Sequence, residues 1–340
     1  MTPQTGPEFV DASRPIPFER FMEFALYGPD GFYTGSTGGS AGRRGDFITS
    51  PEVGPLFGAV FARYLDAEWE RLECPAEFTV VDAGAGPGTL ARSILAADPA
   101  CASSMRYIAV EMSDAQREQH PDGIESASQM PIGASDGVVI ANELLDNMPF
   151  RLAVFDDGWR EAFVDRDGDR FVERLSVPFD PRPTVLATDA SIGSRAPLVD
   201  RACGWIDEAR SCLASGSVVV IDYGVARTAE LAARPWRDWL RTYRGNERGD
   251  HYLEAPGTQD ITTDVPFDQL PEPDAVRTQA EFLQRWGIDD LVAEGKRVWN
   301  EQAARPGLEA MRMRSRVSEA EALVDPAGLG GFLVAEWRVG

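Results

Sequence analysis

The sequence predicts an α/β fold with an open, doubly wound parallel sheet. An apolar run at residues 78–81 is followed by three glycines at alternate positions, and then by apolar residues at helical spacing over 89–95. Two more apolar runs, 137–140 and 217–221, each lead into acidic residues. A sheet of this kind forms its ligand pocket at the carboxyl ends of its strands. We therefore expect the site to be organised around the turn at residues 82–88.

The composition predicts a globular chain without a nucleic-acid or membrane partner. Its 340 residues suit two domains, or one α/β domain with insertions. The formal net charge of −22 disfavours binding to a phosphate backbone, which needs clustered Lys and Arg. The charge would favour a cationic partner, although solubility alone explains an acidic surface. No apolar run approaches the ~20 residues that span a bilayer.

The cysteines and histidines indicate neither a disulfide framework nor a metal site. The four cysteines form no C-x-x-C pair, and the two histidines, His120 and His251, lie far apart in the sequence. Residues 1–17 contain neither the apolar segment of a signal peptide nor an Arg-rich amphipathic helix. We therefore expect reduced thiols and a cytoplasmic protein.

The spacing of the glycines favours one kind of nucleotide ligand. Gly84, Gly86 and Gly88 read G-x-G-x-G, which lacks the last glycine of the dinucleotide pattern G-x-G-x-x-G. A G-x-G-x-G turn after an acidic residue, here Asp82, is typical of S-adenosylmethionine (SAM) methyltransferases. Within the turn only Ala85 and a proline carry a Cβ, so a ligand can lie on the backbone. Taken alone, the motif is equally compatible with a simple tight turn.

The first 75 residues are expected to form a helical cap with a lid. Residues 18–26 place their apolar side chains on one side of a short helix that opens at Pro17. Residues 28–52 are too rich in glycine for regular structure, and we favour a lid over a flexible linker. The methyltransferase-like domain is expected at 76–340.

A long core helix is expected to follow the lid. Ser50 would be its N-cap, Pro51 its first helical residue, and Glu52 the acid of its first turn, with apolar residues repeating to about Leu72. Thr49, Ser50 and the free N–H groups of this helix end are candidates for binding a carboxylate, such as that of a methionine moiety.

The second strand, 107–110, ends at Glu111, about twenty residues after the glycines. An acid at this position accepts hydrogen bonds from the two ribose hydroxyls of an adenosine. A solvated acid at a strand end is the less favoured alternative. Met112 would pack on the adenine ring or in the core. A short third strand is expected at 123–127.

The next strand, 137–140, leads into Asn142, Glu143 and Asp146. The two carboxylates would share a helical face if a helical turn follows the strand. Asp146 as an N-cap and Asn142 as a turn residue are the structural alternatives. The strand at 217–221 ends at Asp222, which is expected at the same edge of the sheet as Glu111.

The remaining segments are expected to be insertions and closing elements. Residues 150–180 alternate around two Asp-Gly turns, which predicts antiparallel hairpins, and a helix is expected at 198–213. The segment from 225 to 315 is expected on the substrate side. It comprises a long functional loop at 225–275, a helix opened by the capping box at Thr278, and a second helix at 288–302. A final strand at 332–337 would close the sheet.

These segments resemble the MidA-type SAM-dependent methyltransferases, nearly from end to end. That family includes a mitochondrial assembly factor that methylates an arginine of a respiratory complex I subunit. The matching stretches are ALYGPDGFY (25–33), GDFITSPEVGPLFG (45–58), AGPGTL (85–90), VEMSDAQREQ (110–119), ANELLDNMP (141–149), IDYG (221–224), TYRG (242–245), PGTQDIT (256–262) and TQAEFL (278–283). This chain departs from the family's usual residues at Asp82-Ala83, Asn147, Asn246 and Asp264.

The resemblance implies a Rossmann-like class I methyltransferase sheet, SAM as the cofactor and a protein arginine as the acceptor. A guanidinium acceptor needs carboxylates to orient it and take up its proton. The candidates for this work are Glu52, Glu143, Asp146 and Asp222. The alternatives are a small-molecule or peptide natural-product acceptor, and a catalytically silent SAM-binding assembly chaperone. An NAD-dependent oxidoreductase is disfavoured by the glycine spacing, and a homodimer is left open.

Overall fold

A computed structural model describes residues 14–35, 49–245, 247–305 and 307–340. The described residues divide into two compact units. Residues 49–144, 207–223 and 273–340 form the sheet unit, and residues 14–35, 145–206 and 224–272 form the accessory unit. The sequence-based division at residue 75 stays a prediction. The two helices of its expected cap, α1 (Phe18–Tyr27) and α3 (Pro55–Arg71), lie in different units.

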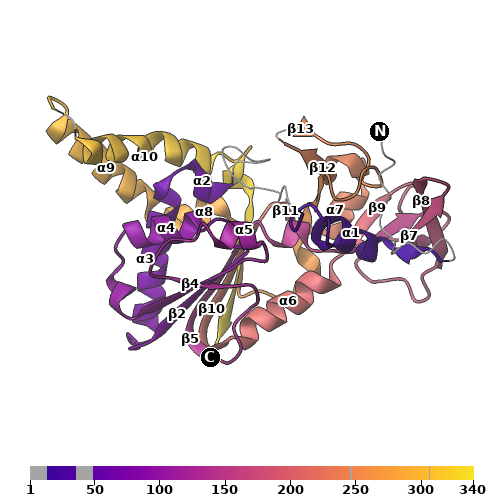
Figure 1. Ribbon diagram of the computed structural model, residues 1–340, viewed down its shortest axis with the longest axis horizontal. Coiled ribbons are helices and arrows are strands. Elements are labelled where there is room, and N and C mark those ends of the chain that lie inside the picture. The colour runs from indigo at the N-terminus through magenta and orange to yellow at the C-terminus, as the bar shows by residue number, and fades with distance from the viewer. Residues whose placement is uncertain (1–13, 36–48, 246, 306) are drawn as a thin grey trace. The chain divides into compact units, whose positions relative to one another are not determined.

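The sheet unit is built on a seven-stranded sheet in the order β16-β17-β10-β5-β2-β3-β4 (Figure 1). Strands β10, β5, β2, β3 and β4 run parallel, and β17 is antiparallel to both β10 and β16. The strands are β2 (Phe78–Ala83), β3 (Met105–Val110), β4 (Glu125–Ala127), β5 (Ser135–Asn142), β10 (Leu213–Asp222), β16 (Ala275–Thr278) and β17 (Leu333–Val339). The predicted neighbour relation of the strands at 78–82 and 137–140 is confirmed by the β2–β5 ladder.

The helices of the sheet unit contribute the apolar faces that bury the sheet. Its core contains Phe57, Phe61 and Tyr64 of α3, together with Val80 of β2 and Ile140 of β5. The helices are α2 (Ser50–Val53), α3, α4 (Thr89–Ala96), α5 (Asp114–Arg117), α8 (Gln279–Arg285), α9 (Ile288–Gln302) and α10 (Leu308–Val324), with 3-10 turns η1 (Ala100–Ser103) and η5 (Leu329–Gly331). Helices α9 and α10 lie side by side (Figure 1).

The long helix expected from Ser50 is interrupted. Thr49 is the N-cap of the short α2, and a break at Gly54 separates α2 from α3. Pro55 favours an extended residue before it, and a Gly-Pro pair marks a turn, so the sequence contains this signal. The break is filled by the buried carboxylate of Glu319, which accepts a hydrogen bond from the N–H of Leu56 at 2.9 Å. A side chain at residue 54 would collide with this carboxylate, since a Cβ on Gly54 would lie 2.3 Å from the Cδ of Glu319.

The accessory unit contains three sheets. The largest has the order β1-β7-β6-β9 with β8 paired to β7, the second has the order β13-β12-β14, and the third pairs β11 with β15. Trp159 of β7, Leu198 of β9 and Ala232 of α7 contribute to its core. The strands are β1 (Ile16–Pro17), β6 (Arg151–Phe155), β7 (Trp159–Asp167), β8 (Arg170–Pro178), β9 (Arg195–Leu198), β11 (Gly224–Val225), β12 (Leu240–Arg244), β13 (Glu247–Arg248), β14 (Asp260–Thr263) and β15 (Val265–Pro266).

The predicted hairpins at 150–180 are confirmed as the antiparallel strands β6, β7 and β8. The prediction of a loop at 225–275 is wrong, because the sheet β13-β12-β14 and three short helical elements occupy much of this segment. The helical elements of this unit are α1, α7 (Thr228–Ala232), η2 (Leu145–Asn147), η3 (Trp236–Asp238) and η4 (Phe267–Gln269). Helix α6 (Asp200–Ser211) contains the boundary between the units.

Other predicted elements have the following outcomes. The capping box is confirmed, since the Thr278 hydroxyl accepts from the N–H of Glu281 at 3.2 Å and the N–H of Thr278 donates to the Glu281 carboxylate at 2.9 Å. The final strand does not close the sheet, because β16 pairs with its outer edge. Helix α10 has no counterpart among the sequence-based elements. The residues of the expected lid at 36–48 lie outside the described part of the chain.

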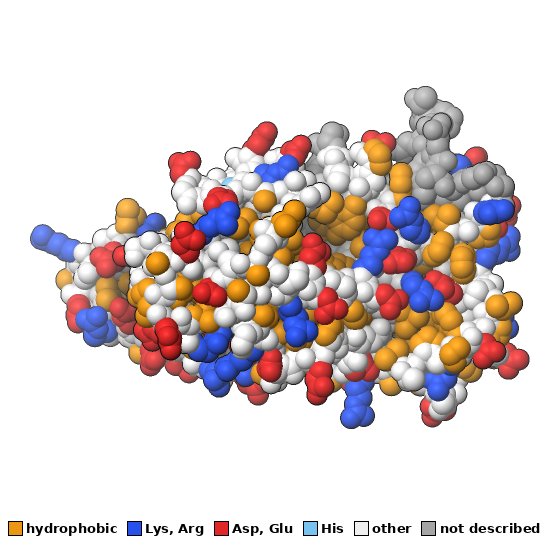
Figure 2. Space-filling view, turned by 90° about the horizontal axis from the view of Figure 1, so that it is seen from below, with side chains coloured by type: hydrophobic (Ala, Val, Ile, Leu, Met, Phe, Trp, Pro, Cys, Tyr) orange, Lys and Arg blue, Asp and Glu red, His pale blue; other side chains and the backbone are white. Residues whose placement is uncertain are grey.

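Charged side chains of both signs are interspersed on the face shown in Figure 2. Within the described ranges, no helix is long and apolar enough to cross a bilayer. The same residues contain no group of three or more His, Cys, Asp or Glu side chains arranged to hold a metal ion. No two of the four cysteines, all of them in the described ranges, form a disulfide.

Candidate cofactor and active site

The turn after β2 is held in a conformation that favours glycine. Gly84, Gly86 and Gly88 have φ angles of 71°, 54° and 79°. The N–H groups of Gly84 and Ala85 both donate to the carbonyl of Val110, at 2.9 and 3.0 Å. The end of β3 therefore fixes the start of the turn, and α4 begins directly after Gly88.

The carboxylate of Glu111 joins the glycine turn to the segment after β3. Its Oε2 accepts from the N–H of Gly86 at 3.1 Å, and its Oε1 accepts from the N–H of Ser113 at 2.8 Å. Glu111 is half-buried, and each carboxylate oxygen can accept a second hydrogen bond. The neighbouring Met112 is 57% exposed, so its side chain is available to an aromatic ring.

His120 also contacts the turn, although the sequence suggests no role for this residue beyond that of a possible metal ligand. Its Nε2 lies 2.9 Å from the carbonyl oxygen of Gly86, and its Nδ1 lies 2.9 Å from the Ser126 hydroxyl. A carbonyl only accepts, so Nε2 carries the proton and donates to Gly86. No motif in the sequence marks this contact, because it depends on the fold bringing residue 120 to the turn.

Asp82 is buried at the end of β2 and accepts a hydrogen bond from the Tyr107 hydroxyl at 2.8 Å. Burial raises the pKa of the Asp82 carboxyl to about 7; the Tyr107 hydrogen bond opposes this shift and the nearby Glu111 charge adds to it. Near neutral pH this carboxyl therefore exists in both protonation states, and as an acid it can also donate a hydrogen bond.

A pocket in the sheet unit brings many of the predicted residues together. It lies between the glycine turn, the start of α2 and the end of β5. The predicted residues that line it are Thr49, Glu52, Asp82, Gly84, Ala85, Gly86, Asn142 and Glu143, and its other lining residues are Pro51, Pro87, Thr89 and Leu90. The predicted residues Ser50, Gly88, Glu111, Met112 and Asp222 belong to the same unit but do not line the pocket.

The backbone at the end of β5 aims two polar side chains at this pocket. Glu143 has a φ of 53°, and its N–H donates to the carbonyl of Ile221 at 2.8 Å. Its Oε1 accepts from the Asn142 amide at 3.1 Å and from the N–H of Ser50 at 3.3 Å. The expected helical face shared by Glu143 and Asp146 is wrong, because Glu143 is in the left-handed region and only a 3-10 turn begins at Leu145.

The pocket fits a ligand with hydrogen-bond donors and a close approach to the backbone. Among the residues that the structure describes, none donates to the buried Oδ1 of Asn142. A ligand donor would satisfy this oxygen, since a buried acceptor without a partner costs free energy. The glycine turn leaves the backbone uncovered beside it. The carboxylate and amide oxygens of this pocket are hydrogen-bond acceptors, which suit the amino and hydroxyl groups of SAM.

Two of the predicted residues are engaged within the protein. Ser50 is buried, and its hydroxyl donates to Oε1 of Gln279 at 2.9 Å. Asp222 is fully buried at the end of β10, where its Oδ1 accepts from the N–H of Tyr223 at 2.9 Å. Both therefore help to shape the edge of the sheet at which the pocket lies.

Asp146 belongs to the accessory unit and to a second buried polar cluster. Its Oδ2 accepts from the Thr262 hydroxyl at 2.6 Å. Asn147 donates to Oδ1 of Asp260 at 3.0 Å and accepts from the Tyr33 hydroxyl at 3.1 Å. Burial raises the pKa of the Asp260 carboxyl to about 7, and the charge of Asp146 adds to this shift. Asp260 was not among the carboxylates predicted from the sequence, although it lies within the PGTQDIT stretch.

Comparison with known proteins is consistent with this site. A family model described as "Putative S-adenosyl-L-methionine-dependent methyltransferase" matches residues 60–284, more than half of the chain. The chain is 27% identical over 308 residues to the Drosophila melanogaster "Protein arginine methyltransferase NDUFAF7 homolog, mitochondrial", which covers 74% of this chain and 65% of that protein. It is 26% identical over 329 residues to the Danio rerio "Protein arginine methyltransferase NDUFAF7, mitochondrial", which covers 82% and 75%.

Two crystal structures of proteins from Burkholderia thailandensis are similar to this chain. One of them, bound to S-adenosyl-homocysteine, has a TM-score of 0.79 and 27% identity and covers 95% of this chain and 88% of that chain. The other has a TM-score of 0.77 and 28% identity and covers 95% and 87%. The predicted α/β fold and the predicted cofactor are confirmed. The chain belongs to this family of SAM-dependent methyltransferases.

Proposed function

We propose that this protein is a protein arginine methyltransferase, which transfers the methyl group of SAM to a guanidinium nitrogen of a protein substrate. The observation that carries the proposal is that the carboxylates of Glu52 and Glu143 line the same pocket as the glycine turn. Carboxylates can orient a guanidinium acceptor and take up its proton. The names of the relatives, which are protein arginine methyltransferases, support this acceptor.

The proposed cofactor residues divide the work of binding SAM. Glu111 would accept from the ribose hydroxyls, Met112 would cover the adenine, and Asn142 would accept from the amino group of the methionine moiety. The others are Thr49, Ser50, Asp82, Gly84, Ala85, Gly86 and Gly88, which would form the floor and the ends of the site. When bound, SAM supplies a methyl group that is activated by its sulfonium charge.

The acceptor side requires a group that orients the guanidinium and takes up a proton. An arginine side chain has a pKa above ~12 and is a poor nucleophile until it loses that proton. Carboxylates can hold its N–H groups in a fixed direction and accept the proton as transfer proceeds. Glu52, Glu143, Asp146 and Asp222 are the proposed residues for this role.

The acceptor class can be tested by incubating the full-length protein with labelled SAM and a lysate of the host lacking this gene. Label on arginine in a protein band, located by mass spectrometry, is the expected result. Label only in small molecules would replace the proposal with a small-molecule or natural-product acceptor. SAM binding by calorimetry, together with a stable protein partner and no methylated product, would replace it with a silent assembly chaperone.

The proposed carboxylates can be tested by removing charge while keeping shape. Glu143→Gln and Asp146→Asn should each lower turnover by about a hundredfold or more, because general-base catalysis contributes on this scale. The affinity for SAM should stay within a few-fold of the wild type. Glu118→Gln, at an exposed acid of the sheet unit outside the pocket lining, is the matched control. Full activity of both variants on the labelled substrate would refute the assignment.

The protein substrate, the cytoplasmic location and a homodimer stay predictions. The names of the curated relatives assign those proteins to mitochondria.

A further inference from the structure

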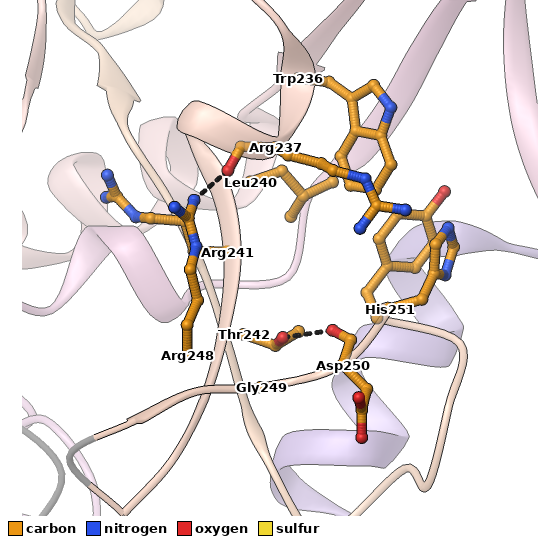
Figure 3. Close-up of a pocket in the computed structure, with 10 residues that line it drawn as sticks. Trp236, Arg237, Leu240, Arg241, Thr242, Arg248, Gly249, Asp250 and His251 are labelled. Atoms are coloured by element: carbon orange, nitrogen blue, oxygen red, sulfur yellow. Dashed lines mark hydrogen bonds between the residues drawn. The ribbon is translucent and has the colours of Figure 1, made fainter.

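A second pocket lies within the accessory unit, and the proposed methyl transfer does not use it. It has a volume of about 230 Å³ and lies between η3, β12 and the segment 249–252 (Figure 3). Aromatic rings and arginine side chains surround it. Its size and its charged lining point to a small polar ligand, since pockets for drug-sized apolar molecules are usually ~300–1,000 Å³.

The wall of this pocket is fixed by hydrogen bonds to buried polar groups. The Thr242 hydroxyl of β12 donates to the carbonyl of Asp250 at 2.5 Å. The buried Gln259 accepts from the N–H of Asp250 at 3.1 Å and donates to the carbonyl of His251 at 3.0 Å. These contacts hold the segment 249–252 beside β12, so the pocket is formed before any ligand binds. A preformed pocket avoids the entropy cost of ordering a loop.

Two arginines that line the pocket are tethered by contacts other than ion pairs. The guanidinium carbon of Arg237 lies 4.5 Å from the centroid of the Trp236 ring, in a cation–π contact. Arg248 donates through Nη2 to the carbonyl of Arg237 (Figure 3). Within the described part of the chain, neither guanidinium lies within 4.0 Å of a carboxylate. Both charges are therefore available to an anion.

Two other arginines at or near the pocket already form ion pairs with carboxylates. Arg241 pairs with Asp264 at 2.7 Å. Arg195, whose guanidinium also lies over the Trp236 ring, pairs with Glu173 at 2.5 Å. One carboxylate, Asp250, belongs to the lining, and in Figure 3 its side chain points away from Trp236 and Arg237. The pocket therefore keeps an excess of positive charge in a chain whose net charge is −22.

The pKa of His251 is affected by the positive charge around the pocket. The pKa of its imidazole is lowered, first by burial and then by the charges of Arg237 and Arg195. A neutral imidazole beside the two tethered guanidinium groups adds a hydrogen-bonding edge to the pocket without adding charge.

We propose that this pocket binds a small oxyanion, a carboxylate or phosphate compound, between the guanidinium groups of Arg237 and Arg248. The planar donors of arginine match the oxygen geometry of both anions, and charge-assisted hydrogen bonds are the stronger kind. This inference does not rest on arginine methylation, because it concerns a different pocket and a different ligand.

The test uses the two histidines of the full-length chain as internal probes. Inorganic phosphate and succinate are titrated separately, with chloride added to constant ionic strength, while the imidazole signals are followed by NMR. One or both anions should shift the His251 signals in a saturable way and leave those of His120 unchanged. The stronger anion identifies the class, phosphate or carboxylate. No saturable shift at His251, or equal shifts at both histidines, would overturn the proposal.

Variants of the two arginines distinguish specific anion binding from a general salt effect. Arg237→Gln and Arg248→Gln should each weaken binding of the active anion by about tenfold or more, since each removes a charge-assisted hydrogen bond to the anion. Arg244→Gln is the matched control, because Arg244 is exposed on β12, a strand of the pocket wall, and bonds to Thr258 outside the lining. An unchanged circular dichroism spectrum and thermal unfolding midpoint show that a variant is folded. Equal affinities of all three variants would contradict the proposal.

Discussion

Gly86 shows how one residue serves both the backbone and the candidate cofactor site. Its φ of 54° lies in the left-handed region, which residues other than glycine adopt only at a cost in conformational free energy. Its N–H donates to Glu111, and its carbonyl oxygen accepts from His120. The residue thus links the proposed ribose-binding acid to the turn on which the ligand would lie.

Gly86→Ala should therefore weaken binding of S-adenosyl-homocysteine by about tenfold, because the strain of ~1–2 kcal/mol would be relieved by shifting the turn. Isothermal titration calorimetry measures the affinity. Gly204→Ala is the control, since a Cβ there meets nothing within 4 Å. If Gly86→Ala bound the ligand as tightly as Gly204→Ala, the turn would not be the cofactor platform.

At the scale of the element, the break between α2 and α3 depends on a residue far along the chain. Glu319 of α10 is buried, and its carboxylate accepts from the N–H of Leu56 and from the Ser315 hydroxyl, at 2.9 and 2.5 Å. The first N–H groups of a helix have no partner within it, so this carboxylate acts as a cap supplied by another helix. It holds the start of α3 and, through Gly54, the end of α2.

Glu319→Ala should lower the free energy of unfolding of the sheet unit by about 1–3 kcal/mol, because the N–H of Leu56 would lose its buried acceptor. Glu319→Gln keeps an acceptor oxygen and should lose less. Chemical denaturation measures the effect, with Glu321→Ala, at an exposed position of the same helix, as the control. Equal stabilities of Glu319→Ala and Glu321→Ala would show that the contact adds nothing to stability.

At the scale of the whole molecule, each unit contains a buried carboxyl group whose pKa is raised to about 7. These are Asp82 in the sheet unit and Asp260 in the accessory unit, and burial is the first cause in both. An ordinary aspartate has a pKa of ~3.9, so in the unfolded chain these groups ionise at lower pH than in the folded protein. Between roughly pH 4 and pH 7 the folded state therefore binds more protons, and a rise in pH destabilises it.

Asp260→Asn should remove the contribution of Asp260 to the pH dependence of stability. Relative to the variant, the wild type should lose about 1.4 kcal/mol of unfolding free energy per pH unit between roughly pH 4 and pH 7, with no further relative change above that range. Denaturation curves at several pH values measure this difference. The asparagine keeps an Oδ1 that can accept from Asn147 and Ile261. If the difference in unfolding free energy between the wild type and the variant does not vary with pH, the pKa of Asp260 is not raised.

The local elements with strong periodicity were predictable because their signals lie within a few residues. The apolar face of α1 is buried as expected, at Phe18, Phe21, Met22, Ala25 and Leu26. Helix α9 begins and ends where its period predicts, at Ile288 and Gln302. The hairpins of β6, β7 and β8 follow from Asp-Gly turns. Each depends on backbone preferences and side-chain spacing that a single segment contains.

The elements that were missed depend on partners elsewhere in the chain. Strand β16 is only four residues long and is stabilised by its ladder with β17. The sheet β13-β12-β14 lies in a polar segment whose strands pair across many residues. Short polar segments carry too little local preference to specify a strand without that pairing.

By itself, the sequence determined where the parallel strands lie along the chain, the glycine turn that follows the first of them and the carboxylates at their ends, because each of these is a local pattern. The tertiary structure decided which of the carboxylates share a pocket. It placed Glu52 and Glu143 beside the glycine turn, Asp146 with Asp260 in a second buried cluster, and His120 against Gly86. Burial and hydrogen bonding between distant residues set these contacts and the raised pKa values of Asp82 and Asp260, and no local spacing encodes them.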